Sequence, residues 1–397
     1  MASQREQRHA RLDVLASSVR GAGEIRRESD SIRLSRLPRW AQAETDAVVT
    51  NPAAQTSGIR VELLTSASQI ELTLRFTRSQ IVVLSRPVAT AKIAVDADGT
   101  ERILEYDEGD LRRFNRDNSV EHLVGGATTA RIHLDDVGTA RKVVIWLPAD
   151  AEVELLDLAA NGGIEAAPRN QRRWTHYGSS ISHCDGAEDP LGAWPVMAAR
   201  ALNLDLYNLG IAGAAQIDGF AARSIRDEKA DLITLKMGIN VINADSLRMR
   251  TFGPAVHSFL DTIRDGHPTT PILLISPIFC PPHEDAPGPT EWSDDWKALA
   301  TSLPGRPTDG QLTLRTIRTT LSNIVEQRRR ADDNLHYLDG RTLLGAKDAR
   351  HLPDDLHPDR AGHRLMSARF TEFLREAADR FLPSGDSLSL SEHGVAG

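Results

Sequence analysis

Cysteine is almost absent, since the 397 residues include only Cys184 and Cys280. Two cysteines exclude the dense disulfide framework that stabilises small secreted domains. No Cys or His spacing around them completes a zinc site, so we expect free thiols and no metal. The run His283-Glu284-Asp285 lies in a proline-rich stretch without a partner motif, and we expect a solvated loop there.

Long apolar runs are absent as well. No stretch approaches the roughly 18 consecutive apolar residues that a membrane-spanning helix requires. Residues 1–30 are rich in Arg, Glu and Ser and lack the apolar core of a signal peptide. We therefore expect no membrane partner and a cytoplasmic location. The sequence leaves the oligomeric state open.

An excess of positive charge is also missing. The formal net charge is −8, whereas nucleic-acid-binding proteins present a basic face, so no nucleic-acid partner is expected. Hydrophobic residues make up 40% and charged residues 26% of the chain, as in ordinary globular proteins. The length of the chain predicts two domains.

The first domain, residues 46–165, is predicted to be all-β. Residues 69–76 alternate strictly between polar and apolar side chains, which is typical of a strand with one buried face. Further short strand-like runs follow at close spacing, and Asp98-Gly99 is a favourable hairpin turn between two of them. This pattern predicts an antiparallel β-sandwich.

The ends of the chain differ from the domains. Residues 1–45 are charged and irregular, and one short helix is predicted around residues 12–19. Residues 384–397 are predicted to be a flexible tail.

The second domain, residues 170–383, is predicted to alternate strands with helices. Helical patterns are clearest at residues 311–329 and after Pro358. The alternation predicts an α/β fold in which helices cover both faces of a parallel sheet. Active sites in such sheets lie beyond the carboxyl ends of the strands. The strand-like runs are residues 174–177, 204–209, 232–236, 272–276 and 335–338.

Four polar stretches follow the predicted strands of this domain. Each contains side chains or glycines that are useful at a catalytic edge, and the first follows the apolar-aromatic run that ends in His176-Tyr177. The stretches are Gly178-Ser179-Ser180, Asn208-Leu209-Gly210-Ile211-Ala212-Gly213, Met237-Gly238-Ile239-Asn240 and Asp354-Asp355-Leu356-His357-Pro358.

Acyl transfer needs groups of these types. A serine hydroxyl is a poor nucleophile that requires a base within hydrogen-bond reach, and histidine titrates in the right range. A carboxylate fixes the imidazole tautomer, and N–H donors stabilise the oxyanion of the tetrahedral intermediate. We predict Ser180 as nucleophile, His357 as base and Asp354 as its partner. The predicted oxyanion donors are the backbone N–H groups of Ser180 and Gly213 and the side-chain amide of Asn240.

The four stretches, in this order, resemble the sequence blocks of the SGNH hydrolases, also called the GDSL esterases and lipases. The resemblance covers roughly residues 173–382 and implies a flavodoxin-like, three-layer hydrolase domain. The family's serine, glycine, asparagine and histidine fall on Ser180, Gly213, Asn240 and His357, and the aspartate of its Asp-x-x-His block falls on Asp354. A jelly-roll-like β-sandwich ahead of such a domain also resembles a salicylyl-transferring GDSL acyltransferase of tetracycline biosynthesis and two-domain carbohydrate esterases.

The sequence departs from the family at one position. The family's Gly-Asp-Ser is Gly178-Ser179-Ser180 here, so a supporting aspartate is missing and Ser179 competes with Ser180 as the nucleophile. Register with the family favours Ser180.

Three further residues compete for the remaining roles. Asp355 competes with Asp354 as the partner of the histidine, although spacing favours Asp354. His176 and His183 flank the serine, but their local spacing would misdirect them as bases, so they are candidates for lining the pocket.

These features predict a serine esterase that cleaves small acyl esters, on a carbohydrate or a natural product, through an acyl-enzyme and without a cofactor. Acyl transfer to an alcohol is the alternative, and a glycan-binding protein with a relic hydrolase domain is an alternative of another class. Residues 46–165 are expected to pack against the hydrolase domain and shape its cleft. Residues 278–310, with Trp292 and Trp296, are either a functional lid or a surface excursion.

Overall fold

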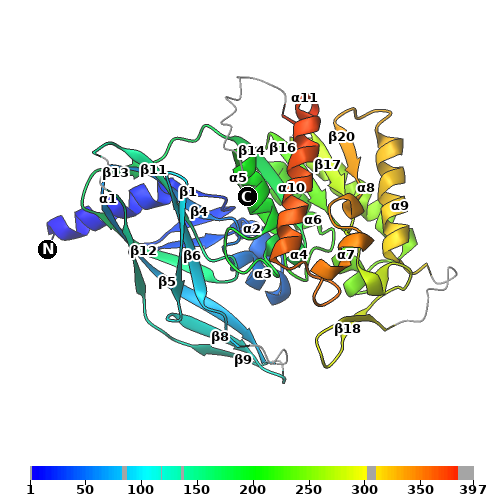
Figure 1. Cartoon of the computed structure of the whole chain (residues 1–397), viewed down its shortest axis with the longest axis horizontal. Helices are drawn as coiled ribbons and strands as arrows, with labels where there is room; N and C mark the ends of the chain where they lie inside the picture. The colour runs from blue at the N-terminus through cyan, green and yellow to red at the C-terminus, as the bar shows by residue number, and fades with distance from the viewer. Residues whose placement is uncertain (1, 83–86, 118, 136–137, 302–309, 383–397) are drawn as a thin grey trace.

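The structure is a computed structural model that describes residues 2–82, 87–117, 119–135, 138–301 and 310–382. A β-rich region and an α/β domain lie side by side, with the carboxyl-terminal helices on the α/β domain (Figure 1). The predicted flexible tail, residues 384–397, lies outside the described residues.

The β-rich region is a sandwich of two sheets. All described pairings within it are antiparallel except the parallel pair β5–β8. One sheet has the order β1 (Val19–Arg20), β4 (Arg60–Thr65), β11 (Arg141–Trp146), β6 (Ala91–Ala97), β7 (Thr100–Tyr106), with β13 (Ile164–Ala166) also paired to β4. The other has the order β2 (Glu24–Arg27), β3 (Ile32–Ser35), β12 (Glu152–Ala160), β5 (Gln69–Ile81), β8 (Asp110–Phe114), β9 (Val120–Leu123), with β10 (Thr128–His133) also paired to β5.

Local sequence explains much of this sandwich. In β5 the apolar residues Ile70, Leu72, Leu74 and Phe76 are fully buried, while the polar residues between them are partly exposed. Asp98-Gly99 joins β6 to β7 as expected, with positive φ angles of 53° and 79° that suit a tight hairpin turn. The predicted β-sandwich is confirmed.

The amino-terminal segment is more ordered than the sequence predicts. Helix α1 (Ala2–Ser18) buries Leu12 and Leu15 in the sandwich core, and β2 and β3 extend one of the sheets. Two short helices follow, α2 (Arg39–Ala43) and α3 (Ala47–Ala54). The apolar stripe of α1 is narrow and surrounded by charge, so the segment's order comes from tertiary packing rather than from periodicity.

The α/β domain contains a five-stranded parallel sheet with the order β15-β14-β16-β17-β20. Numbered along the chain this is 2-1-3-4-5, the flavodoxin-like order that the resemblance implies. The predicted α/β fold is confirmed, and each strand lies within two residues of its expected ends. The strands are β14 (Arg172–Gly178), β15 (Leu204–Gly210), β16 (Leu232–Lys236), β17 (Ile272–Ile275) and β20 (Leu335–Leu338).

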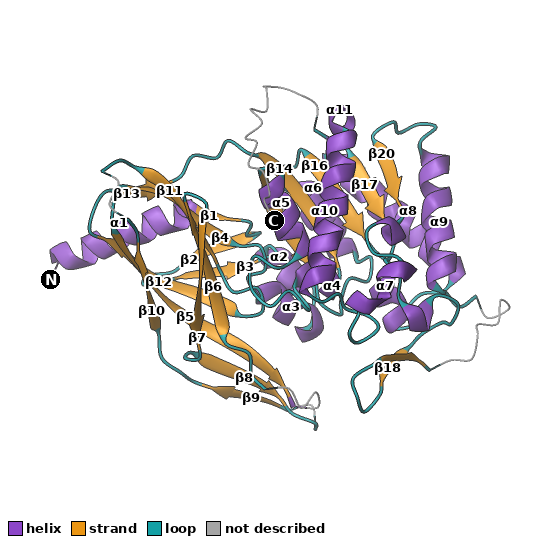
Figure 2. Ribbon diagram, viewed as in Figure 1, coloured by secondary structure: helices purple, strands orange, loops and turns teal. Residues whose placement is uncertain are grey.

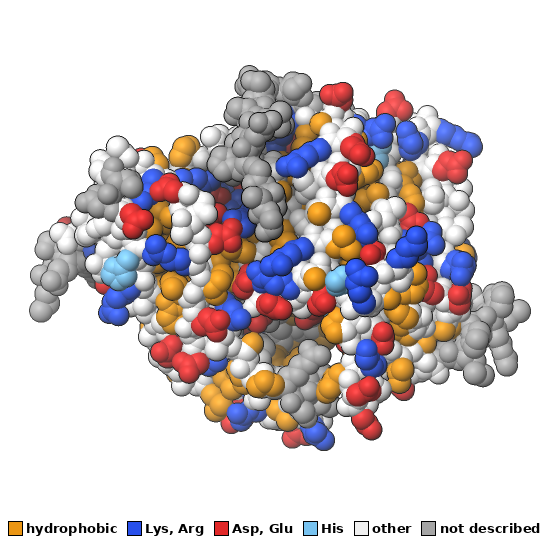
Figure 3. All heavy atoms as spheres, in the orientation of Figure 1, with side chains coloured by type: hydrophobic (Ala, Val, Ile, Leu, Met, Phe, Trp, Pro, Cys, Tyr) orange, Lys and Arg blue, Asp and Glu red, His pale blue; other side chains and the backbone are white. Residues whose placement is uncertain are grey.

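Helices cover both faces of this sheet (Figure 2). One face packs against α6 (Gly219–Asp227), α8 (Met249–Gly266) and α9 (Leu314–Arg328). The other packs against α5 (Trp194–Ala201), α10 (Arg360–Glu376) and α11 (Ala378–Phe381). Within the described ranges, no helix has the length and apolar character needed to cross a membrane. On the face shown in Figure 3, acidic and basic side chains are interspersed.

A buried arginine joins the two regions. Arg36, which follows β3, is fully buried and donates hydrogen bonds to carbonyl oxygens on both sides of the boundary. Its acceptors are Gln55 (2.8 Å) and Pro52 in the β-rich region, and Asn208 (3.1 Å) and Gly210 at the end of β15. Burial lowers the pKa of Arg36 to about 10, so the guanidinium stays charged at neutral pH.

A second buried cation supports the same boundary. Arg60 on β4 contacts Asp205 on β15 at 2.6 Å and Glu62 at 2.7 Å, and its guanidinium lies 5.0 Å from the ring centroid of Trp146. The β-rich region therefore packs against the α/β domain, as the sequence leads us to expect.

Replacing Arg36 by Met should lower the free energy of unfolding by about 3 kcal/mol or more, because several buried carbonyl groups would lose their donor. Urea denaturation measures this change. Arg131→Met is the matched control: that arginine is 65% exposed beside Glu71, and its loss should cost less than about 1 kcal/mol. Equal effects of the two substitutions would contradict the role given to Arg36.

Candidate active site

The turn that carries Ser180, the predicted nucleophile, begins where β14 ends. Gly178 closes the strand, Ser179 is extended, and the short helix α4 (Ser180–His183) starts directly after it. A Cβ on Gly178 would lie 2.4 Å from the Ser182 hydroxyl oxygen, so only glycine allows this close approach. The turn places Ser180, which is 6% exposed, at the carboxyl edge of the central strands.

Three side chains form a continuous hydrogen-bonded line at this edge. Ser180 Oγ lies 2.9 Å from Nε2 of His357, although the two residues are 177 positions apart. His357 Nδ1 lies 2.7 Å from Oδ2 of Asp354. The other carboxylate oxygen of Asp354 accepts from the backbone N–H groups of Leu356 (3.0 Å) and His357 (2.6 Å), which folds the loop back on itself.

Electrostatics keep the Asp354 carboxyl ionised. Burial alone would raise its pKa, but the hydrogen bonds from the His357 ring and from the backbone N–H groups outweigh burial and hold the pKa below the ordinary value. An ionised carboxylate fixes the proton of the imidazole on Nδ1 and leaves Nε2 to accept the serine proton.

The predicted oxyanion donors follow three neighbouring strands. β14 pairs with β15 on one side and with β16 on the other, so Ser180, Gly213 and Asn240 come from adjacent strand ends. Gly213 has a φ of +72° and open space where a side chain would be. The amide oxygen of Asn240 accepts from Ala215 N–H at 3.1 Å, which leaves the NH2 group of the amide as the part that can donate.

Comparison with known proteins bears on the α/β domain that carries these residues. Residues 176–365 match the model of the GDSL-like lipase/acylhydrolase family. These residues form a GDSL-like domain. A domain of this type belongs to an ester hydrolase or an acyltransferase. No curated protein sequence matches the chain.

Solved structures resemble the chain over both of its regions. The salicylyl-acyltransferase SsfX3 from a tetracycline biosynthetic pathway aligns over 92% of this chain and 95% of its own, with 26% identity and a TM-score of 0.74. A family two carbohydrate esterase from Cellvibrio japonicus shares the fold over 92% of this chain and 97% of its own (14% identity, TM-score 0.55). A family two carbohydrate esterase from Clostridium thermocellum, in complex with cellohexaose, shares the fold over 81% of this chain and 93% of its own (16% identity, TM-score 0.53).

The two alternative residues, Ser179 and Asp355, do not join the line of hydrogen bonds through His357. The hydroxyl of Ser179 is buried without a hydrogen-bond partner in the described part of the chain, whereas Ser180 contacts the imidazole. Asp355 has a φ of 63° and pairs with Lys297 at 3.5 Å.

The two flanking histidines are buried, and their ring nitrogens contact protein groups. His176 contacts the hydroxyls of Thr234 (2.6 Å) and Ser182 (2.8 Å), and burial, followed by the charge of Lys236, lowers its pKa to about 3. His183 lies 3.2 Å from the Arg36 guanidinium, and burial, followed by that charge, lowers its pKa. Both histidines pack as neutral rings against the turn that carries Ser180.

The two thiols are unpaired. Burial raises the pKa of Cys184 and of Cys280, so both stay protonated at neutral pH. Among the residues with described positions, no three His, Cys, Asp or Glu side chains gather as a metal site would require.

A hairpin that the sequence did not predict covers the imidazole. Strands β18 (Thr290–Trp292) and β19 (Ala298–Ala300) pair within the segment considered as a lid or an excursion. The Trp292 ring is parallel to the His357 ring within 5°, with centroids 6.2 Å apart. Ala298 N–H donates to the carbonyl oxygen of Asp354 at 2.9 Å. The hairpin is therefore tied to the loop that carries the histidine.

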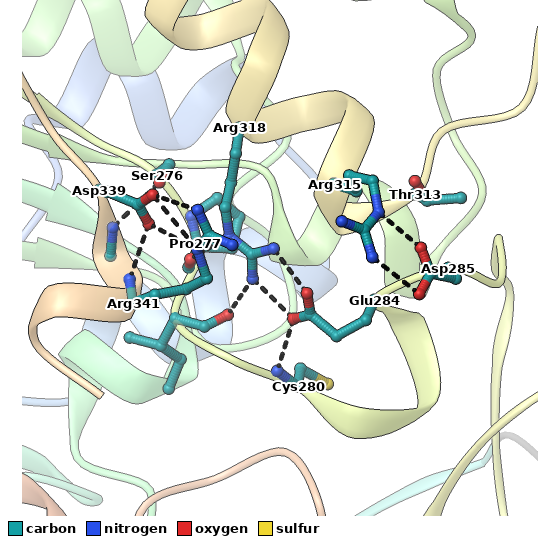
Figure 4. Close-up of polar contacts among 12 residues, drawn as sticks. Ser276, Pro277, Cys280, Glu284, Asp285, Thr313, Arg315, Arg318, Asp339 and Arg341 are labelled. Carbon is teal, nitrogen blue, oxygen red and sulfur yellow. Dashed lines mark hydrogen bonds and ion pairs between the residues drawn. The ribbon is translucent and has the colours of Figure 1, made fainter. Parts of the chain in front are cut away.

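Figure 4 shows how the beginning of this segment is anchored. The buried Arg318 on α9 donates to the carbonyl oxygens of Pro277 (3.0 Å) and Ile278 (2.8 Å). It also makes two hydrogen bonds of 2.7 Å to Glu284, whose carboxylate accepts from Cys280 N–H.

This anchor corrects the expectation of a solvated loop at residues 283–285. His283 is fully buried and contacts the Thr290 hydroxyl at 2.7 Å, and Glu284 pairs with Arg318. Only Asp285 is exposed, beside Arg315. The proline-rich composition concealed the burial because the partners lie on a distant helix and on the hairpin.

Asp354→Asn should lower kcat for a short-chain aryl ester by about 10³–10⁴-fold, because an amide no longer holds the imidazole in the required tautomer. Asp355→Asn is the matched control, since it removes the neighbouring carboxylate and keeps a residue that tolerates positive φ. Steady-state kinetics of the two variants show whether Asp354 or Asp355 is the partner of His357. A larger loss in Asp355→Asn would reverse the assignment.

Proposed function

We propose that the chain is a serine acylhydrolase that cleaves small acyl esters through an acyl-enzyme on Ser180. The line of hydrogen bonds from Ser180 Oγ through the His357 ring to Asp354 supports this proposal most directly. The match of residues 176–365 to the GDSL-like lipase/acylhydrolase family supports the same reaction class.

The proposed reaction has two halves. Ser180 Oγ attacks the ester carbonyl carbon while its proton passes to His357 Nε2, and the ionised Asp354 stabilises the imidazolium. The tetrahedral intermediate collapses, the C–O bond to the alcohol breaks, and the departing alcohol takes the proton from Nε2. A water molecule then gives a proton to Nε2 and attacks the acyl carbon. The second tetrahedral intermediate collapses, the bond from the acyl carbon to Ser180 Oγ breaks, and Oγ takes the proton back from Nε2 as the acid leaves.

The negative oxygen of each intermediate needs N–H donors. We propose the backbone N–H groups of Ser180 and Gly213 and the NH2 group of Asn240 for this role. They follow adjacent strands, and the contact of Asn240 with Ala215 ties two of the three donors to one loop. Such donors are effective because they are oriented before the charge develops.

Acyl transfer to an alcohol is the second candidate. The similarity over 92% of the chain to a salicylyl-acyltransferase favours it, and the same acyl-enzyme serves both reactions. A panel of esters that varies the acyl length and the sugar, assayed with and without added alcohols, separates the two. New ester formed in preference to free acid would identify a transferase.

Ser180→Ala should lower kcat/KM for an aryl ester by about a thousandfold or more and abolish labelling by a fluorophosphonate probe. Ser179→Ala is the control and should still be labelled, because its hydroxyl does not contact the imidazole. Undiminished activity in Ser180→Ala would reject the proposed nucleophile. A folded wild type that is never labelled would favour the glycan-binding alternative.

Asn240→Ala should lower kcat by about 10²–10³-fold with little change in KM, because the oxyanion exists only along the reaction path. Asn240→Asp keeps the acceptor for Ala215 N–H but removes the donor, so it should be equally impaired. Activity within threefold of wild type in either variant would remove Asn240 from the oxyanion site.

A further inference from the structure

A second carboxylate lies beside the imidazole. Asp185 Oδ2 is 3.7 Å from His357 Nε2, the same ring nitrogen that contacts Ser180 Oγ. The Asp185 side chain is 46% exposed, and within the described ranges its carboxylate makes no hydrogen bond and no other ion pair. A negative charge with no stronger partner thus borders the atom that exchanges protons with substrate.

The backbone of Asp185 is held from both sides. Its N–H donates to the Ser180 carbonyl oxygen at 3.2 Å, and its own carbonyl oxygen lies 2.8 Å from Nε2 of His363 on α10. His363 Nδ1 accepts from Trp194 N–H, so Nε2 carries the ring proton and donates. Burial lowers the pKa of His363 to about 4, which keeps this arrangement neutral and intact near pH 7.

The chemistry of the triad places one part of the ester next to Asp185. The oxygen of the departing alcohol must come within about 3 Å of Nε2 to take its proton. An acceptor alcohol enters at the same position, because deacylation by an alcohol is the reverse of acylation. The alcohol part of the ester therefore lies within reach of the Asp185 carboxylate, while the acyl oxygen faces the donors on the other strand ends.

A cavity of about 340 Å³ opens beside Asp185, between the two regions of the chain. The β-rich region contributes Thr90, Lys92 and Asp150 to its wall, and the loop after α4 contributes Asp185 and Glu188. Burial, with the charge of Asp185 adding to it, raises the pKa of Asp150. The volume accommodates an alcohol much larger than water, and the carboxylates disfavour a second anion there.

We propose that Asp185 selects the alcohol part of the ester, and that the cavity takes an alcohol that carries a cationic nitrogen a few bonds from its hydroxyl. This inference rests on the proposed acyl-enzyme reaction and specifies its substrate class. Asp185 acts on specificity because it contacts the leaving or accepting alcohol, whereas Asp354 acts on the imidazole.

A pair of isosteric esters tests the inference. Choline and 3,3-dimethylbutanol have the same shape, but only choline carries a positive charge, so their esters with one accepted acyl group differ in charge alone. Wild-type kcat/KM should favour the choline ester by roughly threefold to tenfold, as for a partly exposed ion pair. Asp185→Asn should bring the ratio of the two esters near one, and Asp185→Lys should invert it.

Glu291→Gln is the matched control. Glu291 is exposed on β18 next to Trp292, and neighbouring side chains of a strand point to opposite faces, so it faces away from the imidazole. Its loss removes one negative charge near the site and should leave the ratio of the two esters unchanged.

The outcomes separate this inference from the proposed function. A wild type that hydrolyses both esters with a ratio near one, or an Asp185→Asn variant that keeps the wild-type preference, overturns the inference alone. A folded wild type that hydrolyses neither ester, nor any ester of the panel, overturns the proposed function and the inference together.

Discussion

The burial of the Arg36 guanidinium is the constraint on which the arrangement of the two regions depends. A buried cation is tolerated only when its donors are satisfied, and here carbonyl oxygens from the β-rich region and from the end of β15 satisfy them together. The same guanidinium contacts His183 at the end of α4, the short helix that begins at Ser180. The β-rich region is therefore held against the turn that carries Ser180.

Three parts of the chain surround the imidazole of His357. Asp354 fixes it from its own loop, the β18–β19 hairpin places Trp292 parallel to its ring, and Asp185 faces Nε2 from the loop after α4. The hairpin in turn depends on the anchor of Arg318 at Pro277 and Glu284. Asp354 and Arg318 act through buried hydrogen bonds, Trp292 through ring contact, and the described structure holds the imidazole 2.9 Å from the serine hydroxyl without a metal ligand or a disulfide.

The proposed reaction gives the two sides of the site different electrostatics. In this proposal, neutral N–H donors lie at the strand ends where the oxyanion would form, and carboxylates line the cavity that would take the alcohol. A positive alcohol would be attracted to the second side, while the acyl oxygen is stabilised on the first. The sandwich contributes Asp150 to the negative wall of this cavity, and it also contributes one cation, Lys92, which the acidic side chains of the wall outnumber.

The sequence by itself determined the local features of this protein. The periodicity of residues 69–76 predicts β5, the Asp98-Gly99 pair predicts its hairpin, and the alternation in the second half predicts the parallel sheet. The carboxyl ends of the strands in such a sheet lie along one edge. The residue types found after those ends therefore also predicted the contact of Ser180 with His357.

Only the tertiary structure decided which distant groups touch. The burial of α1, the Arg36 contacts, the place of Trp292 and the approach of Asp185 to Nε2 have no periodic signal in the chain. Each depends on packing between segments far apart in sequence, or on how a loop without regular structure is directed by its neighbours. Local patterns report which face of an element is buried, but they carry no information about the partner that buries it.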